Sequence, residues 1–321
     1  MKYPISLWLE VESRCNLACK FCYNFWRPAT ETYPQTLSTD ELLRGLSALL
    51  DEFECRRVAL SGGEPLLRSD LEEIVAFFKQ RQVRVVLTTN GALLSDAKVD
   101  SLRASGVDIV QVSLHSSRPD EHDWLSSGPA FRGAMLALMR ARERGIGLAA
   151  VYVATSRNLL HFPDTLRLLA DIDISTIIFN RFIVSGLGIQ NRDELGVPDD
   201  RTVLDMLNDA QIVAETHRQT IVMGTPVSVD PQTRRRLSAI RFGSCPIRQH
   251  QTRWTIGVDG AIRRCNQSPV SIGNLLSDGI SELRKTYSDS REPLGVTNRC
   301  GKCQLDNVYF QPAAPESRVA Y

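Results

Sequence analysis

Short apolar runs alternate with longer amphipathic segments through the first 190 residues of the chain. The apolar runs have the length of strands, and in the segments between them apolar residues recur at helical spacing. The predicted strands cover residues 5–11, 57–61, 83–89, 109–114, 148–154 and 176–182. The predicted helices cover residues 38–53, 69–81, 95–105, 131–144 and 161–171. Strands and helices that alternate in this way form parallel βαβ units.

Six such units are too few for a closed barrel of eight. We therefore expect an α/β fold in which residues 1–195 form a partial (β/α)6 TIM-like barrel. An amphipathic helix predicted at 201–218 places a linking region at 196–240. In barrels of this type, functional groups lie at the C-terminal ends of the strands.

The last part of the chain has a different pattern. Residues 254–258 and 261–264 are short strand candidates separated by Asp259-Gly260, a typical hairpin turn. A helix is predicted at about 278–287. We therefore expect residues 241–321 to form a small domain built from a β-hairpin and a helix.

Composition narrows the class of protein. The chain has 321 residues, of which 43% are hydrophobic and 23% charged, as in ordinary soluble domains. The net charge of +1 gives no basic surface for nucleic acid or an anionic membrane. No apolar run is long enough for a membrane helix, and Glu10 interrupts the N-terminal apolar stretch, so no secretory signal is predicted. We expect a cytoplasmic protein with neither a membrane nor a nucleic-acid partner.

Three of the eight cysteines, Cys15, Cys19 and Cys22, directly follow the first predicted strand in a C-x3-C-x2-C run. Their thiolates suit an iron–sulfur cluster, and three ligands leave one iron of a cubane open for chemistry. A zinc knuckle or three unrelated buried cysteines are the plainer interpretations.

This run, together with Phe21 before its last cysteine, resembles the signature of the radical S-adenosylmethionine (SAM) enzymes. The resemblance implies a [4Fe-4S] cluster on Cys15, Cys19 and Cys22. It also implies that the amino and carboxylate groups of SAM chelate the open iron. One electron, supplied by a reductant such as flavodoxin or ferredoxin, would then cleave SAM to methionine and a 5′-deoxyadenosyl radical.

A second motif, Gly62-Gly63-Glu64-Pro65, follows the second predicted strand. Adjacent glycines let a backbone approach a ligand closely, and Glu64 adds an acceptor, although an ordinary strand-to-helix turn would look the same. The motif resembles the GGEP motif that binds the amino group of SAM in this family. By the same resemblance, the residues that bind SAM are Phe21, Gly62, Gly63, Glu64, Pro65, Thr89, Asn90, Ser113 and Asn158. Polar capping of strand ends is the plainer interpretation of Thr89, Asn90 and Ser113.

Two further side chains are candidates for contact with the substrate. His115 points to the same side as Ser113 by strand alternation, although a structural histidine is the plainer interpretation. Arg181, at the end of the sixth predicted strand, suits a bidentate carboxylate contact or an ion pair with a neighbouring acid. We treat both as candidate catalytic residues.

The remaining cysteines fall into two groups. Cys245, Cys265, Cys300 and Cys303 would form a closed tetrathiolate site for zinc or for an iron–sulfur cluster. Their pattern resembles the twitch domain, the half-length form of the SPASM domain, which implies one auxiliary [4Fe-4S] cluster. Cys55 is left over and is expected to act as a small buried hydrophobe.

These expectations combine into a radical SAM enzyme that abstracts a hydrogen atom from its substrate. The first expected substrate is a ribosomally made peptide that is matured by oxidation or cross-link formation. The alternative is radical oxidation, dehydration or epimerisation of a small metabolite such as an aminosugar. A hypothesis of another class is a non-catalytic iron–sulfur protein that transfers electrons or acts as a scaffold.

Overall fold

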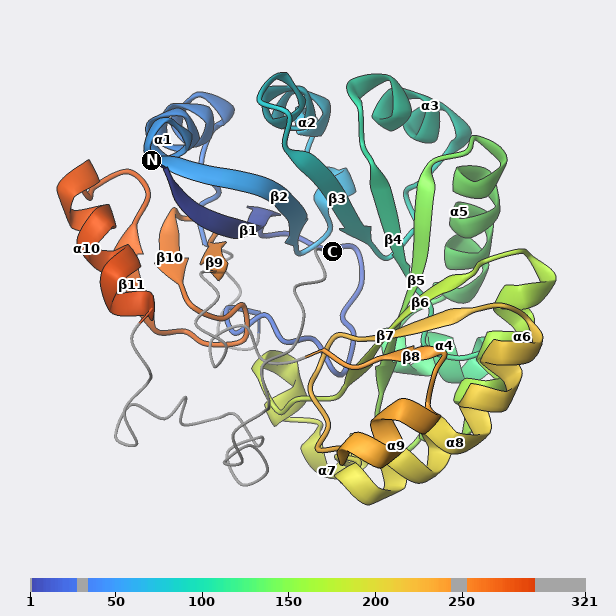
Figure 1. Cartoon of the computed structure of the whole chain (residues 1–321). Helices are drawn as coiled ribbons and strands as arrows, with labels where there is room; N and C mark the ends of the chain where they lie inside the picture. The colour runs from blue at the N-terminus through green and yellow to red at the C-terminus, as the bar shows by residue number, and fades with distance from the viewer. Residues whose placement is uncertain (1, 28–33, 244–252, 292–321) are drawn as a thin grey trace.

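The computed structural model describes residues 2–27, 34–243 and 253–291, and within them the strands form one curved sheet (Figure 1). The strands are β1 (Tyr3–Glu12), β2 (Phe53–Gly62), β3 (Arg84–Thr89), β4 (Ile109–Ser113), β5 (Gly147–Ala154), β6 (Thr176–Arg181), β7 (Thr220–Met223), β8 (Ile240–Arg241), β9 (Arg253–Ile256), β10 (Ala261–Arg263) and β11 (Ser271–Asn274). The helices are α1 (Thr39–Glu52), α2 (Leu71–Gln80), α3 (Asp96–Ser105), α4 (Pro119–Ser126), α5 (Phe131–Glu143), α6 (Phe162–Asp171), α7 (Arg192–Leu195), α8 (Asp200–Thr216), α9 (Pro231–Arg236) and α10 (Ile280–Arg291), with short 3-10 turns η1 (Pro65–Leu67), η2 (Leu159–His161) and η3 (Gly186–Ile189).

The central part of the sheet confirms the predicted open barrel. Strands β1 to β8 lie side by side in chain order and pair in parallel, and the helices between them cover the outside of the curve (Figure 1). The strand order ends in β11 on one side and β8 on the other, so the sheet does not close. The parallel series runs beyond the six predicted strands, because the short strands β7 and β8 follow α8.

The predicted hairpin joins this same sheet. Strands β9 and β10 pair antiparallel, as the Asp259-Gly260 turn predicts, and β9 pairs in parallel with β1 through Trp8 and Thr255. Strand β11 then adds to β10, and α10 follows. The described part of the C-terminal segment therefore continues the barrel wall on the side of β1.

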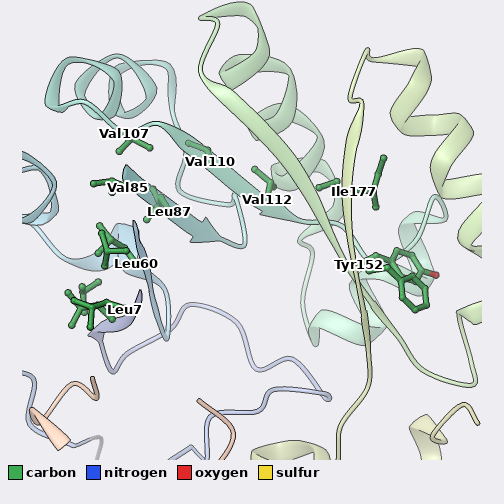
Figure 2. Close-up of a cluster of buried hydrophobic side chains, with 14 of the residues drawn as sticks. Leu7, Leu60, Val85, Leu87, Val107, Val110, Val112, Tyr152 and Ile177 are labelled. Atoms are coloured by element: carbon green, nitrogen blue, oxygen red, sulfur yellow. The ribbon is translucent and has the colours of Figure 1, made fainter. Parts of the chain in front are cut away.

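The main hydrophobic core lies between the sheet and its outer helices. Figure 2 shows Leu7, Leu60, Leu87, Val110 and Ile177 from successive strands in this layer, and all are at most 3% exposed. Alternate residues of each strand face this core. The intervening residues, such as Glu10 of β1, face the concave side.

The sequence missed or misplaced a few local features. Helix α4 lies where the apolar pattern predicts no helix, and it begins at Pro119, since proline is favoured at a helix start. Cys55 lies inside β2 and is buried, not before that strand, because β2 starts directly after α1. Among the residues described, no helix is long and apolar enough to span a bilayer.

Candidate active site

The loop after β1 carries the three predicted cluster ligands. Cys15, Cys19 and Cys22 are free and partly buried, and the Cys22 backbone N–H donates to the Cys19 carbonyl at 3.0 Å. The Lys20 N–H donates to the Leu125 carbonyl of α4 at 2.9 Å. The loop is therefore fixed to a neighbouring element at the C-terminal end of the barrel.

The three thiols lie close enough to affect one another. Burial, then the neighbouring Cys22 and Cys15, raise the pKa of Cys19. Burial also raises the pKa of Cys22, against the effect of donors from the Asn24 backbone and the Arg27 side chain. Proximity of three thiols with donors around one sulfur fits a cluster in which each thiolate binds its own iron.

A single metal ion and a cubane cluster need different spacings between their protein ligands. Within the residues described, no three His, Cys, Asp or Glu side chains are placed to hold one metal ion. Thiolates on a cubane bind different irons and so stand farther apart than the ligands of one tetrahedral zinc. The cluster on Cys15, Cys19 and Cys22 stays a prediction for these three residues.

The two glycines at the end of β2, Gly62 and Gly63, allow a close approach of backbones. A Cβ on Gly62, which has φ of +134°, would lie 2.4 Å from the Glu12 carbonyl oxygen. A Cβ on Gly63 would lie 2.1 Å from the Arg14 carbonyl oxygen. The Gly63 and Glu64 N–H groups donate to these same oxygens at 2.6 and 2.8 Å. The glycines thus hold the start of the cysteine loop against β2.

Glu64 connects the end of β2 to the end of β3. Its carboxylate accepts from the Thr89 hydroxyl at 2.7 Å, the Asn90 N–H at 2.8 Å and the Leu66 N–H at 3.1 Å. The side chain is 1% exposed, and this burial raises the pKa of Glu64. Pro65 starts η1 directly after it. These bonds bring Glu64, Thr89 and Asn90 together beside the cysteine loop.

Asn90 makes the contact with the cysteine loop itself. Its Nδ2 donates to Asn16 Oδ1 at 2.8 Å and lies 3.9 Å from Cys15 Sγ. Its Oδ1 accepts from the Ala92 N–H at 2.9 Å.

Ser113 ends β4 and is partly buried. The SAM-binding roles of these residues stay predictions.

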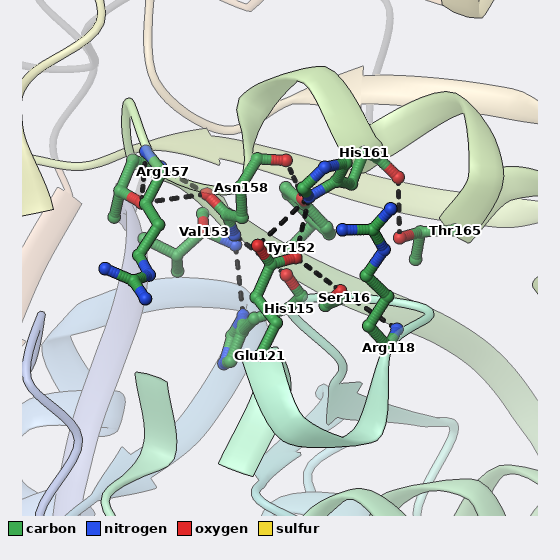
Figure 3. A network of polar contacts seen from close by, with 11 residues as sticks. His115, Ser116, Arg118, Glu121, Tyr152, Val153, Arg157, Asn158, His161 and Thr165 are labelled. Carbon is green, nitrogen blue, oxygen red and sulfur yellow. Dashed lines mark hydrogen bonds and ion pairs between the residues drawn. The ribbon is translucent and has the colours of Figure 1, made fainter. Parts of the chain in front are cut away.

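His115 lies in a polar network after β4 (Figure 3). Its Nδ1 accepts from the Val153 N–H at 3.1 Å, so the proton of the neutral ring is on Nε2. Its backbone N–H donates to His122 Nδ1 at 3.0 Å. Burial, and then the neighbouring His122, hold the pKa of His115 well below its usual value. The Phe21 ring meets the His115 ring edge-on at 4.5 Å between centroids, so His115 supports the cysteine loop.

Asn158 uses its whole amide inside this network (Figure 3). Its Oδ1 accepts from the N–H and hydroxyl of Thr155, at 2.7 and 2.9 Å. Its Nδ2 donates to the carbonyls of His115 and Val153, at 2.8 and 3.0 Å. Asn158 therefore ties the ends of β4 and β5 together, and its contact with SAM stays a prediction.

Arg181 is paired with an acid, one of the two alternatives that its sequence position left open. Its Nη1 contacts the Asp200 carboxylate and lies 3.5 Å from the Pro198 carbonyl oxygen. The residue is 7% exposed. This pair joins the end of β6 to the start of α8, and a direct catalytic role for Arg181 stays a prediction.

Comparison with known proteins places this site in a family. Residues 9–169, half of the chain, match the family model described as the radical SAM superfamily. The chain belongs to the radical SAM superfamily. Membership implies SAM and one [4Fe-4S] cluster, and residues 9–169 contain the cysteine loop, Glu64, Asn90 and His115.

The relatives of this chain have names that describe different reactions. An AdoMet-dependent heme synthase of Nitratidesulfovibrio vulgaris is 32% identical over 326 residues, which cover 93% of this chain and 84% of the relative. An Fe-coproporphyrin III synthase of Methanosarcina barkeri is 29% identical over 210 residues, which cover 64% of this chain and 51% of the relative. The chain thus spans about half the length of the Methanosarcina enzyme.

A solved structure shares the fold of this radical SAM protein. Streptococcus suis SuiB, bound to its precursor peptide SuiA, superposes with a TM-score of 0.71 at 16% identity. The match covers 96% of this chain and 71% of SuiB. At this identity the likeness shows the fold alone.

Only Cys265 of the predicted auxiliary ligands can be placed. It lies just after β10 and is partly buried, and its Sγ accepts from the Gln267 N–H at 3.4 Å. Cys245, Cys300 and Cys303 lie outside the described residues. The auxiliary cluster of this radical SAM protein therefore stays a prediction.

Several residues that join the two cysteine regions were missed by the sequence analysis. The Ser185 hydroxyl lies 3.0 Å from the Tyr23 carbonyl oxygen and 3.1 Å from that of Gln267. Arg263 contacts Glu10 in the barrel wall. A charged Glu10 inside an apolar strand was the available signal, because such a residue needs a buried partner.

Proposed function

We propose that the chain reductively cleaves SAM at a cluster on Cys15, Cys19 and Cys22 and abstracts a hydrogen atom from a bound substrate. The supporting observation is that three free thiols share one loop against which Asn90 and the Gly62–Gly63 turn are packed. When bound, the cluster supplies the electron that converts SAM to methionine and a 5′-deoxyadenosyl radical.

The side chains of the barrel position and shield this chemistry. Asn90 Nδ2 lies 3.9 Å from Cys15 Sγ and orients the first ligand. Glu64 holds the Asn90 backbone and is itself fixed by Thr89, so the wall opposite the loop is rigid. The Phe21 and His115 rings pack against each other beside the loop, on the side of β4.

The first substrate that we propose is a ribosomally made peptide, which would be matured by oxidation or cross-link formation. Its support is the fold shared with SuiB, whose solved complex holds the precursor peptide SuiA. Co-expression with a short reading frame from the neighbouring genes tests this proposal through a mass change in the peptide. An unchanged peptide, with the enzyme loaded and cleaving SAM, would count against it.

The second candidate is a small metabolite. It is favoured by the relative that matches 93% of this chain, which is named a heme synthase rather than a peptide-modifying enzyme. The two candidates share the radical step and differ in what the barrel mouth recognises.

The auxiliary cluster belongs to the same proposal. We expect Cys245, Cys265, Cys300 and Cys303 to hold a second [4Fe-4S] cluster that accepts an electron from the substrate radical. Iron and sulfide are measured after anaerobic reconstitution of the wild type and of the Cys15/Cys19/Cys22→Ala variant. About eight irons falling to about four supports two cubanes. About four irons falling to none, with one zinc retained, would replace the auxiliary cluster by a zinc site.

A further inference from the structure

Arg157 is a cation at the mouth of the barrel, and no carboxylate of the described residues pairs with it. It lies in the turn after β5, is exposed, and its guanidinium carbon is 4.0 Å from the centroid of the Trp124 ring. No ion pair to Arg157 exists among the described residues. Figure 3 shows its side chain extending away from the polar network that contains Asn158 and His161.

The turn that carries Arg157 is held rigidly on both sides. The Arg157 N–H donates to the Thr155 hydroxyl at 3.3 Å, and the Ser156 N–H donates to the Gly196 carbonyl at 3.2 Å. The next residue, Asn158, is fully buried with its amide completely hydrogen-bonded. The backbone under the guanidinium therefore has little freedom to move.

A second cation shares the same indole. Lys20 Nζ lies 4.7 Å from the centroid of the Trp124 ring and 3.1 Å from Glu194 Oε2. Lys20 belongs to the cysteine loop, between Cys19 and Cys22. The Trp124 ring thus contacts both Lys20 of the cysteine loop and Arg157 of the turn after β5.

The apolar surroundings strengthen this arrangement. Trp124 packs on a small cluster at the barrel mouth, formed by the buried side chains of Leu125, Phe182 and Leu195. An arginine stacked on an aromatic face keeps its in-plane N–H donors directed outward. That planar fork matches the two oxygens of a carboxylate or phosphate.

We propose that Arg157, stacked on Trp124, binds an oxyanion group of the substrate beside the cysteine loop. The substrate of this site then carries a carboxylate or a phosphate, whichever of the two candidate classes it comes from. The inference rests on the proposed function only in assigning the oxyanion to the substrate.

The test is an anaerobic calorimetric titration of the reconstituted full chain with inorganic phosphate and with succinate, at fixed ionic strength. For the probe that the wild type binds more tightly, Arg157→Gln should lower the affinity by about tenfold, as loss of a charge-assisted bidentate contact implies. Arg157→Lys keeps the positive charge but lacks the planar guanidinium, so its affinity for that probe should lie between those of the wild type and Arg157→Gln. Arg103→Gln, an exposed arginine on α3, is the charge-matched control and should stay within about twofold of the wild type.

Four results would overturn the proposal. They are the absence of binding of either probe to the wild type, equal affinities of wild type and Arg157→Gln, an equal loss in Arg103→Gln, and a parallel loss of SAM affinity in Arg157→Gln. The last would assign the oxyanion to the carboxylate of SAM. These titrations contain no reductant and measure oxyanion binding without SAM cleavage. A protein that fails to cleave SAM can therefore still show, or fail to show, the binding at Arg157.

Discussion

Arg263 of β10 contacts Glu10 of β1 in a buried ion pair between residues 253 apart in sequence. The two side chains are 2% and 0% exposed. Arg263 also lies 3.3 Å from the Ser268 carbonyl oxygen, in the turn that follows Cys265. The strand that leads into the first cysteine loop and the strand that precedes Cys265 therefore share one buried contact.

Removal of one partner of this pair should destabilise the protein strongly. Glu10→Leu leaves the Arg263 guanidinium buried without its carboxylate, so we expect a loss of about 3–5 kcal/mol in the free energy of unfolding. The double variant Glu10→Leu/Arg263→Met should recover most of that loss. Urea unfolding of the metal-free chain, followed by circular dichroism, measures both.

An exposed pair provides the control for this experiment. Arg284 and Glu52 also join distant parts of the chain, but their side chains are 50% and 23% exposed. Glu52→Gln should therefore change the free energy of unfolding by no more than about 1 kcal/mol. Equal effects of Glu10→Leu and Glu52→Gln would contradict a special role for the buried pair.

The buried His122 predicts a dependence of stability on acid pH. Burial lowers the pKa of His122 from 6.5 to about 4, and its Nδ1 accepts from the His115 N–H. The unfolded chain therefore binds a proton below about pH 6.5 that the folded chain does not bind until about pH 4. Stability should fall as pH drops through this window, by at most about 1.4 kcal/mol per pH unit from this group.

This dependence is isolated by comparison with His122→Gln, which cannot titrate. The difference in the free energy of unfolding between wild type and His122→Gln is measured in urea from pH 7 to pH 4.5. The wild type should lose stability relative to the variant over that range. Parallel curves would show that His122 is not held neutral in the folded protein.

Gly63 should be intolerant of a side chain. A Cβ there would lie 2.1 Å from the Arg14 carbonyl oxygen, a backbone atom that cannot rotate away. Gly63→Ala should shift the start of the cysteine loop and lower the iron bound on reconstitution by more than about half, since ligand geometry controls metal binding. The control is Gly279→Ala, where no atom lies within 4 Å of the added Cβ. Normal iron content in Gly63→Ala would contradict the close packing of loop and β2.

Asn158 should be sensitive even to an isosteric change. Asn158→Asp replaces the Nδ2 donor to the His115 and Val153 carbonyls by an acceptor facing both of them. We expect a loss of at least about 2–3 kcal/mol in the free energy of unfolding, because two buried acceptors lose their donor. Thermal unfolding of the metal-free chain provides the measurement. A shift of the midpoint by less than about 2 °C would contradict the tie between β4 and β5.

The sequence predicts the barrel half of the fold because each strand there has its own apolar run and a helix of adequate length after it. Strand β7 has only a three-residue apolar run, Ile221–Met223, and the two residues of β8 become a strand only by pairing with β7. The parallel pairing of β9 with β1 was not expected, since hairpin sequences specify their own turn but not the strand that they join.

The candidate site shows the same division between local and long-range information. The cysteine spacing and the glycine motif are local patterns, and the structure brings both to one end of the barrel. The partner of Glu10 lies 253 residues away, and no periodicity encodes it. The stacking of Arg157 on Trp124 likewise depends on α4, a helix that the apolar pattern alone did not reveal.

Formation of 5′-deoxyadenosine tests the central claim most directly. The reconstituted wild type and the Cys22→Ala variant are incubated anaerobically with SAM and dithionite, and the nucleoside is quantified by chromatography. We predict 5′-deoxyadenosine from the wild type and none above background from the variant, since loss of one ligand removes the cluster site. A wild-type chain that carries its cluster and releases no 5′-deoxyadenosine would contradict the account and favour a non-catalytic iron–sulfur protein.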